Sequence, residues 1–156
     1  ESGKYSILFK PHPLTGISDI DEVNEYKRKM YRLAKDYQNI TTYGSDADIH
    51  KLMNESDLMI TDISSVLNDY LYTRKPMILM KVQESSIDKI HEEFPSTQAT
   101  YILDEANEAL TLIDSISKSD DLWDKRLEIC KYSLGDFSNG SMDRFREVIL
   151  DSLGKG

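Results

Sequence analysis

Short apolar segments that end abruptly in polar residues alternate along this chain with longer stretches of helical periodicity. The apolar segments predict strands at residues 5–9, 39–43, 58–60, 77–80 and 101–103. Apolar side chains that recur every three or four residues predict helices over about 19–37, 46–54, 65–73, 86–93, 106–117, 120–133 and 141–153. Strands that alternate with helices in this way form parallel βαβ units. We therefore expect an α/β fold, with a parallel sheet covered by helices on both faces.

Length and charge limit the possible partners. A chain of 156 residues is long enough for one domain with a real core, so we expect residues 1–156 to form a single domain. Its net charge is −9, and residues 1–40 carry one net positive charge while residues 41–156 carry ten net negative charges. An acidic surface argues against nucleic acid or an anionic membrane as the main partner. An anionic ligand must therefore be held by local donors.

Cysteine content and hydropathy indicate the cellular setting. The single cysteine, Cys130, excludes an intrachain disulfide and a cysteine-rich zinc site, and favours a cytoplasmic protein. No apolar run reaches the length of a membrane span, and no signal peptide opens the chain. Because Glu1-Ser-Gly-Lys4 leads almost directly into a predicted strand, we expect this sequence to be a piece of a larger protein.

The most informative polar cluster lies in Asp57-Leu-Met-Ile-Thr-Asp-Ile-Ser-Ser65. A parallel strand here would deliver Thr61 and Asp62 to the sheet edge at which α/β proteins bind ligands. Ser64 would then cap the next helix, and Ser65 would be its first residue. Free backbone N–H groups, the helix dipole and two hydroxyls would converge on a spot that suits a phosphate. A plain helix cap is the simpler alternative.

Two further residues are candidates for the same ligand. Asp69 shares a helical face with Ser65, so its carboxylate could accept hydrogen bonds from ribose hydroxyls; an ordinary solvated aspartate is the alternative. His12 follows the first predicted strand within Lys10-Pro-His-Pro13, where two prolines restrict the backbone. A protonated imidazole there could neutralise charge on a departing nucleotide, whereas the alternative is a turn histidine without a role.

Other patterns carry less chemistry. Asp46-Ala-Asp48 fits a metal-binding motif of sugar transferases, but it opens a predicted helix, where acids are favoured anyway, so we expect no metal site. No glycine-rich dinucleotide loop or Walker loop is present, and we expect no tightly bound cofactor. His50 and His91 lie in predicted helices without partner residues nearby in the sequence, and we interpret both as structural.

Several motifs together resemble a known family. Lys10–Pro13, Asp57–Ser65, Asp69-Tyr-Leu71 and Pro76 occur in the order and at the separations found in the C-terminal half of the CDP-glycerol glycerophosphotransferase family, the teichoic-acid polymerase type. Asn139–Arg144 is similar to the family's closing Gly-x-x-x-Arg helix start. The resemblance covers roughly 5–80 closely and 135–150 loosely. It implies a Rossmann-like domain, the donor-binding C-terminal half of a bacterial enzyme with the GT-B fold.

The resemblance also implies roles for the candidate residues. His12 matches a catalytic histidine at the donor phosphates, and Ser64 and Ser65 match phosphate-binding hydroxyls. Asp69 matches the acidic position directed at the ribose. Ser141 and Arg144 match the terminal motif that faces the diphosphate. The predicted substrate-binding residues are therefore Lys10, Thr61, Asp62, Ser64, Ser65, Asp69, Ser141 and Arg144.

The implied reaction is attack of an acceptor hydroxyl on the phosphorus that bears glycerol, with CMP leaving and the hydroxyl proton released. The partners would be CDP-glycerol or a related CDP-alcohol donor, and a cell-wall or capsule polymer acceptor bound by the N-terminal half that this sequence lacks. The piece alone should be inactive. We expect a cytoplasmic location, peripheral at the inner face of the cell membrane if other parts of the full-length protein contact it.

Two departures from the family keep alternatives open. Ile63 stands where the family usually has tyrosine, and residues 81–85 lack the aromatic residues usual there. The donor could therefore be another CDP-alcohol or a nucleotide sugar. The alternatives are the C-terminal half of a GT-B glycosyltransferase and a non-catalytic, flavodoxin-like binding module.

Overall fold

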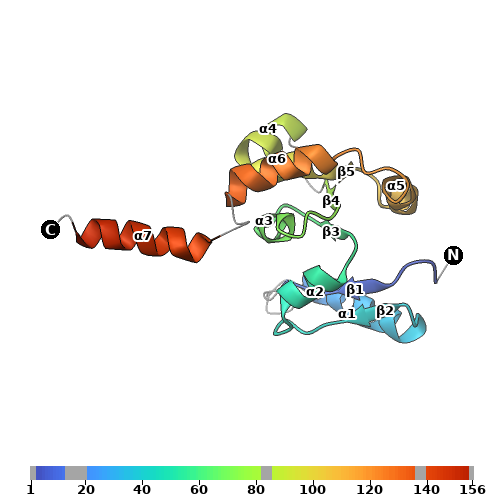
Figure 1. Cartoon of the computed structure of the whole chain (residues 1–156). Helices are drawn as coiled ribbons and strands as arrows, with labels where there is room; N and C mark the ends of the chain where they lie inside the picture. The colour runs from blue at the N-terminus through green and yellow to red at the C-terminus, as the bar shows by residue number, and fades with distance from the viewer. Residues whose placement is uncertain (1–2, 13–20, 82–85, 136–139, 155–156) are drawn as a thin grey trace. The chain divides into compact units, whose positions relative to one another are not determined.

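A computed structural model of the chain describes residues 3–12, 21–81, 86–135 and 140–154. They fall into two compact units, Glu1–Ser56 and Asp57–Gly156, each of which contains a parallel sheet flanked by helices (Figure 1). The predicted α/β class, with Rossmann-like parallel strands, is therefore confirmed. The single domain over residues 1–156 stays a prediction.

The first unit is built from two parallel strands and two helices. Its elements are β1 (Ile7–Phe9), α1 (Asp21–Asp36), β2 (Ile40–Thr42) and α2 (Ile49–Glu55). Ile7 is in register with Ile40, and helix α1 packs against β2. Asp48 caps α2, because its Oδ1 accepts hydrogen bonds from the backbone N–H groups of His50 (2.9 Å) and Lys51 (3.4 Å). The carboxylate that resembled a metal ligand therefore serves a helix start.

The second unit contains a three-stranded parallel sheet in the order β3-β4-β5. Its elements are β3 (Met59–Thr61), α3 (Val66–Leu71), β4 (Met77–Met80), α4 (Ile87–Glu93), η1 (Pro95–Ala99), β5 (Tyr101–Leu103), η2 (Ala106–Glu108), α5 (Ala109–Ile116), α6 (Trp123–Leu134) and α7 (Ser141–Leu153). The short 3₁₀ helix η1 was not predicted, and the helix expected over 106–117 is divided into η2 and α5. Every other predicted element is present with small changes at its ends.

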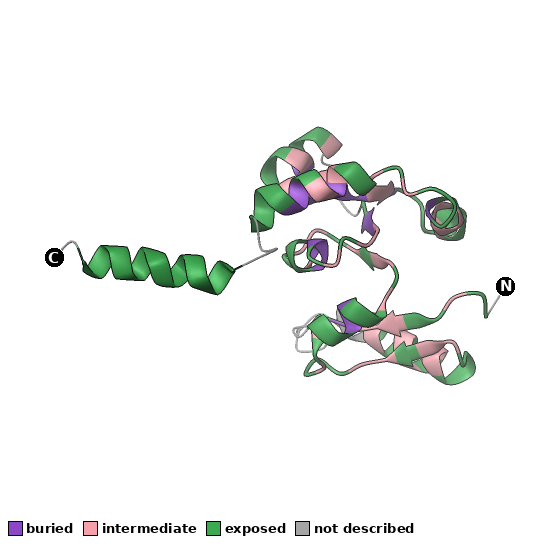
Figure 2. Cartoon of the chain, in the orientation of Figure 1, coloured by how far each residue is buried: buried purple, intermediate pink, exposed green. Residues whose placement is uncertain are grey.

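The core of the second unit lies around its central strand. The first three side chains of β4 are almost completely buried, as are the inward-facing side chains of α3 (Figure 2). These residues are Met77, Ile78, Leu79, Leu67, Tyr70 and Leu71. Helix α6 adds Ile129 and Cys130 and packs against α3 and η1. Cys130 is therefore a buried core residue, and this burial raises the pKa of its thiol.

Helix α6 also buries a charged side chain. Arg126 is fully buried, and its Nε donates a hydrogen bond to the backbone carbonyl of Arg74 (3.0 Å), while its Nη2 donates to the carboxylate of Asp120. The other oxygen of Asp120 accepts a hydrogen bond from the Tyr101 hydroxyl (2.9 Å), whose oxygen accepts one from the Leu122 N–H (3.2 Å). Burial, reinforced by Asp120, raises the pKa of Tyr101. The network joins β5, α6 and the turn after α3.

The isoleucines Ile60 and Ile78 are directly paired in register, but they differ in burial, at 41% and 0% exposed. Ile78→Ala should lower the free energy of unfolding by about 2–5 kcal/mol, because it leaves a cavity in the core. Ile60→Ala should lower it by less than about 1 kcal/mol. Urea unfolding followed by circular dichroism measures both, and equal losses would contradict the assignment of the core.

Asp120→Ala should destabilise the chain by about 3 kcal/mol, because it leaves the buried Arg126 guanidinium without its carboxylate. The neighbouring Asp121→Ala removes an exposed carboxylate and should change stability by less than about 0.5 kcal/mol. Adding Arg126→Met to Asp120→Ala should restore part of the loss, since the unpaired charge is gone. Thermal and urea unfolding measure these changes, and a mild effect of Asp120→Ala would show that the buried pair contributes little.

Candidate functional site

The carboxyl ends of three parallel strands meet at one edge of the second unit. Thr61 is in register with Leu79, and Met80 with Leu103, so the segments that follow β3, β4 and β5 leave the sheet side by side. Lys81, just after β4, lies with its Nζ 3.4 Å from Oδ1 of Asp104, just after β5. Ligands of open α/β sheets bind at this edge, so it is the candidate site.

A small cavity opens between the segment after β3 and the segment after β4. Its volume is about 130 Å³, and it is lined by Asp62, Ile63, Leu79, Met80, Lys81, Ile87 and Ile90. The lining is mostly apolar, with one acidic and one basic side chain. Pockets for whole small molecules usually exceed roughly 300 Å³. This cavity therefore has room for one group of a larger ligand, whose remainder would lie along the exposed edge.

The adjacent serines Ser64 and Ser65 differ in their hydrogen bonds at the start of α3. The prediction that Ser64 caps the helix and Ser65 is its first residue is wrong by one position, because α3 begins at Val66 with Ser65 as the cap residue. The reason is a tight first turn, in which the Leu67 N–H donates to the carbonyl of Ser64 (3.1 Å). The Ser64 hydroxyl still accepts a hydrogen bond from the Val66 N–H (3.4 Å). Ser65 makes no side-chain cap, and it is exposed.

The other predicted residues of this segment lie close by along the chain. Thr61 ends β3 and is half-buried, Asp62 follows it and lines the cavity, and Asp69 is an exposed residue of α3. Ser65 and Asp69 are four residues apart at the start of this helix and share its face. The structure thus gathers five predicted site residues between β3 and α3, while the ligand roles assigned to them stay predictions.

Lys10 and His12 lie in the first unit, after β1. Lys10 Nζ donates a hydrogen bond to the backbone carbonyl of Ser45 (3.2 Å), which connects the segments that follow β1 and β2. His12 is exposed two residues later, next to the buried Pro11. The second proline of the motif, Pro13, lies outside the described residues. The catalytic role of His12 stays a prediction.

Ser141 and Arg144 lie in the first turn of α7, and both are exposed. Gly140 precedes the helix with φ of +66°, a conformation that favours glycine. The motif Gly-x-x-x-Arg is therefore a helix start, as the resemblance implied. The contact of Ser141 and Arg144 with a diphosphate stays a prediction.

Sequence reasoning missed two charged residues at the candidate edge. Lys81 and Asp104 were assigned no role, although each directly follows an apolar strand. Near the same edge, Ser86 caps helix α4, because its hydroxyl accepts a hydrogen bond from the Lys89 N–H (3.4 Å).

His91 makes a structural contact, with its Nδ1 2.8 Å from Oγ1 of Thr97.

Within the described residues, no cluster of three or more histidine, cysteine or acidic side chains could hold a metal ion. No helix in the described part of the chain has both the length and the apolar character needed to cross a membrane.

Comparison with known families identifies the chain. The family model for CDP-Glycerol:Poly(glycerophosphate) glycerophosphotransferase matches residues 1–145. The chain belongs to this family. The predicted family is therefore confirmed, and with it the assignment to glycerophosphotransferases, a family of transferases.

A curated relative points to the same biology. The minor teichoic acid biosynthesis protein GgaB of Bacillus subtilis (strain 168) is 33% identical over 86 residues. The match covers 54% of this chain and 8% of GgaB, so the chain corresponds to a small part of that relative. No solved structure matches the chain.

The two serines make separable contributions to stability. Ser64→Ala removes the hydroxyl that accepts the first free N–H of α3 and should destabilise the second unit by about 1 kcal/mol. Ser65→Ala removes a hydroxyl without a capping bond and should change stability by less than about 0.5 kcal/mol. Chemical unfolding of the two variants tests this. A larger loss for Ser65→Ala would reverse the assignment.

Proposed function

We propose that this chain is the donor-nucleotide-binding part of a transferase that moves glycerol phosphate, or a related polyol phosphate, from a CDP-alcohol to a cell-wall or capsule polymer. The observation that carries the proposal is the family match over residues 1–145. The relative named for teichoic acid biosynthesis supports the same class of acceptor. The polar residues at the carboxyl edge of β3 and β4 supply suitable chemistry for a phosphate-bearing ligand.

In this proposal the segment between β3 and α3 holds the donor diphosphate. The hydroxyl of Ser65, which makes no capping bond, would donate a hydrogen bond to a phosphate oxygen. Asp69 would accept hydrogen bonds from the ribose hydroxyls. Lys81 would place a positive charge beside the 130 Å³ cavity, which has room for one phosphate-sized group.

The chemical step would be phosphoryl transfer. The acceptor hydroxyl forms a new P–O bond to the phosphorus that bears the alcohol and releases its proton. The bond from that phosphorus to the bridging oxygen breaks, and CMP leaves with the electron pair. Such reactions depend mainly on positioning and on stabilising negative charge. Lys10, His12 and Arg144 would supply cationic groups for this purpose. The reacting end of the acceptor would be held by other parts of the full-length protein, so the chain alone should bind donor without turning it over.

The remaining features of the proposal rest on composition and resemblance. We propose that the protein needs no tightly bound cofactor, and that it works in the cytoplasm, at the inner face of the cell membrane. Ile63, which lines the cavity where the family usually has tyrosine, is the observation that favours a second candidate. The second candidate is the C-terminal half of a GT-B glycosyltransferase, which would bind a nucleotide sugar at the same edge and would not need the aromatic ring of the glycerophosphotransferases.

The test is a titration of the chain with CMP, CDP-glycerol and UDP-sugars, followed by amide NMR shifts. We expect cytidine ligands to shift the amides of His12, Ser64, Ser65 and Asp69. Ser65→Ala should weaken CDP-glycerol binding about fivefold to tenfold, because one hydrogen bond to a charged oxygen is lost. Ser115→Ala, at an exposed serine of α5, is the matched control and should leave the affinity unchanged.

The outcomes separate the three candidate functions. Shifts with uridine ligands alone would replace the glycerophosphotransferase by a glycosyltransferase. Silence from every nucleotide in both the chain and the full-length protein would indicate a non-catalytic binding module.

A further inference from the structure

Helix α1 contains a segment in which every charged side chain is basic, although the chain as a whole is acidic. Residues 27–35 contain five basic side chains and no acidic one, whereas the whole chain has a net charge of −9. The run lies entirely within the first unit, away in sequence from the segment between β3 and α3. It is not used by the donor-binding proposal.

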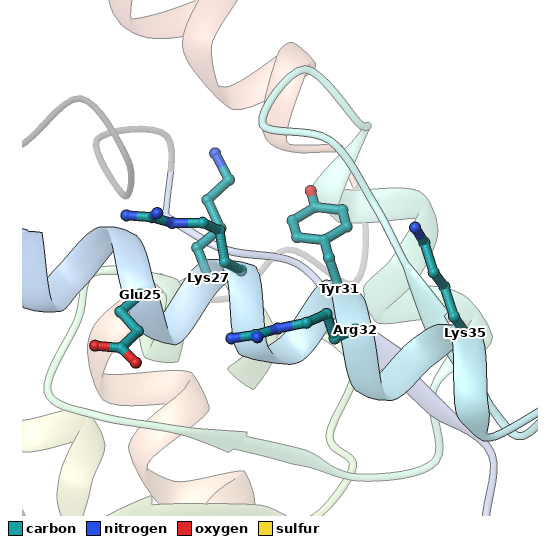
Figure 3. A pocket seen from close by; sticks show the side chains of 6 residues that line it. Glu25, Lys27, Tyr31, Arg32 and Lys35 are labelled. Carbon is teal, nitrogen blue, oxygen red and sulfur yellow. The ribbon is translucent and has the colours of Figure 1, made fainter.

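The basic side chains line an open hollow along the helix. The hollow has a volume of about 710 Å³ and is lined by Glu25, Lys27, Arg28, Tyr31, Arg32 and Lys35. Lys27, Tyr31 and Lys35 follow one another at intervals of one helical turn and extend from the same side of α1 (Figure 3). The Tyr31 hydroxyl donates a hydrogen bond to the backbone carbonyl of Tyr43 (3.3 Å), which holds the half-buried ring between the two lysines.

An ordinary solvated helix face does not account for this charge pattern. The apolar side of α1, with Met30, Leu33 and Ala34, is half-buried and the helix packs against β2, so the opposite side needs to be polar but not of one sign. Arg32 and Lys35 are three residues apart and are neighbours on the helix surface, so their like charges repel each other. No salt bridge among the described residues involves Arg32 or Lys35. An anionic ligand would offset this repulsion.

We propose that this basic face of α1, formed by Lys27, Arg28, Arg32 and Lys35 around Tyr31, binds the anionic polyol-phosphate polymer that serves as acceptor. The inference rests on the proposed function, which names that class of acceptor. Such a polymer carries one negative phosphodiester in every repeat, and cations one turn apart along α1 repeat about every 5.4 Å. The Tyr31 ring offers an apolar surface for the carbon segments between phosphates. Binding at α1 would raise the local concentration of polymer at the enzyme.

The shape and chemistry of the face favour a flexible polymer over a membrane. Helices that bind membrane surfaces bury an apolar face in the lipid. No described side chain of α1 is a large exposed hydrophobic residue. The hollow is also open, and the described residues that line it extend from Glu25 to Lys35 along one helix, which suits an extended chain better than a compact nucleotide.

The experiment measures binding of lipid-free poly(glycerol phosphate) to the 156-residue chain by calorimetry. Arg32→Gln/Lys35→Gln should weaken binding at least about fivefold, because two ion pairs with phosphates are lost. Glutamine keeps the helix propensity of α1. The matched control, Lys118→Gln/Lys131→Gln, removes the same charge from exposed positions of the second unit and should stay within about twofold of the parent chain. Affinity should also fall between about 50 mM and about 200 mM salt.

Each outcome decides the proposal. Equal losses in the two double variants, or equal binding of a neutral polyglycerol, would overturn it. Binding of phosphatidylglycerol vesicles but not of lipid-free polymer, with the same sensitivity to the α1 variant, would replace the polymer by a membrane. CDP-glycerol affinity should be unchanged in the α1 variant. If the α1 variant loses polymer binding but keeps its CDP-glycerol affinity, the result supports the α1 site. If the parent chain binds polymer but no donor nucleotide, the result counts only against the donor-binding function.

Discussion

Strand β4 is hydrogen-bonded along both edges, to β3 on one side and to β5 on the other, and its first three side chains are almost fully buried. Backbone N–H and C=O groups at such depth must be paired, and they pair here with the parallel strands β3 and β5 in a fixed register. The register in turn brings the segments after all three strands to one edge. The positions of Asp62, Lys81 and Asp104 are thus a consequence of core packing, since each directly follows a strand that cannot shift.

The distribution of charge limits the ways in which an acidic chain could bind anionic ligands. With a net charge of −9, the chain as a whole repels phosphate-containing ligands, so binding depends on local groups. At the β3–β4 edge the local groups are the Ser65 hydroxyl and the Lys81 ammonium, which act over short distances. Along α1 they are several cations on one face, which act over a longer range. Short-range donors suit one defined diphosphate, whereas a row of charges suits a repeating polymer.

The sequence was most informative where one local signal dominated. Pro76 followed by Met77-Ile-Leu-Met80 predicted β4 to the residue, because an apolar run after a proline has few alternatives. The start of α3 was displaced by one residue, since adjacent serines offer two possible caps and only the tight first turn distinguishes them. Arg126 was missed because a helical arginine normally lies in solvent. Its acceptor, the carbonyl of Arg74, is 52 residues away, and local periodicity does not encode such a partner.

The segment between β3 and α3 illustrates why a fold signal and a site signal are hard to separate in sequence. Ser64 satisfies a backbone N–H at the start of α3, so its hydroxyl is explained by folding alone. Ser65 has the same side chain one position later, but it is exposed and makes no cap. Folding therefore accounts for one hydroxyl of the pair and leaves the other unexplained. The exposed hydroxyl lies at the carboxyl edge of a parallel sheet, where folding does not occupy it, so it is the member of the pair that the proposed donor site can use.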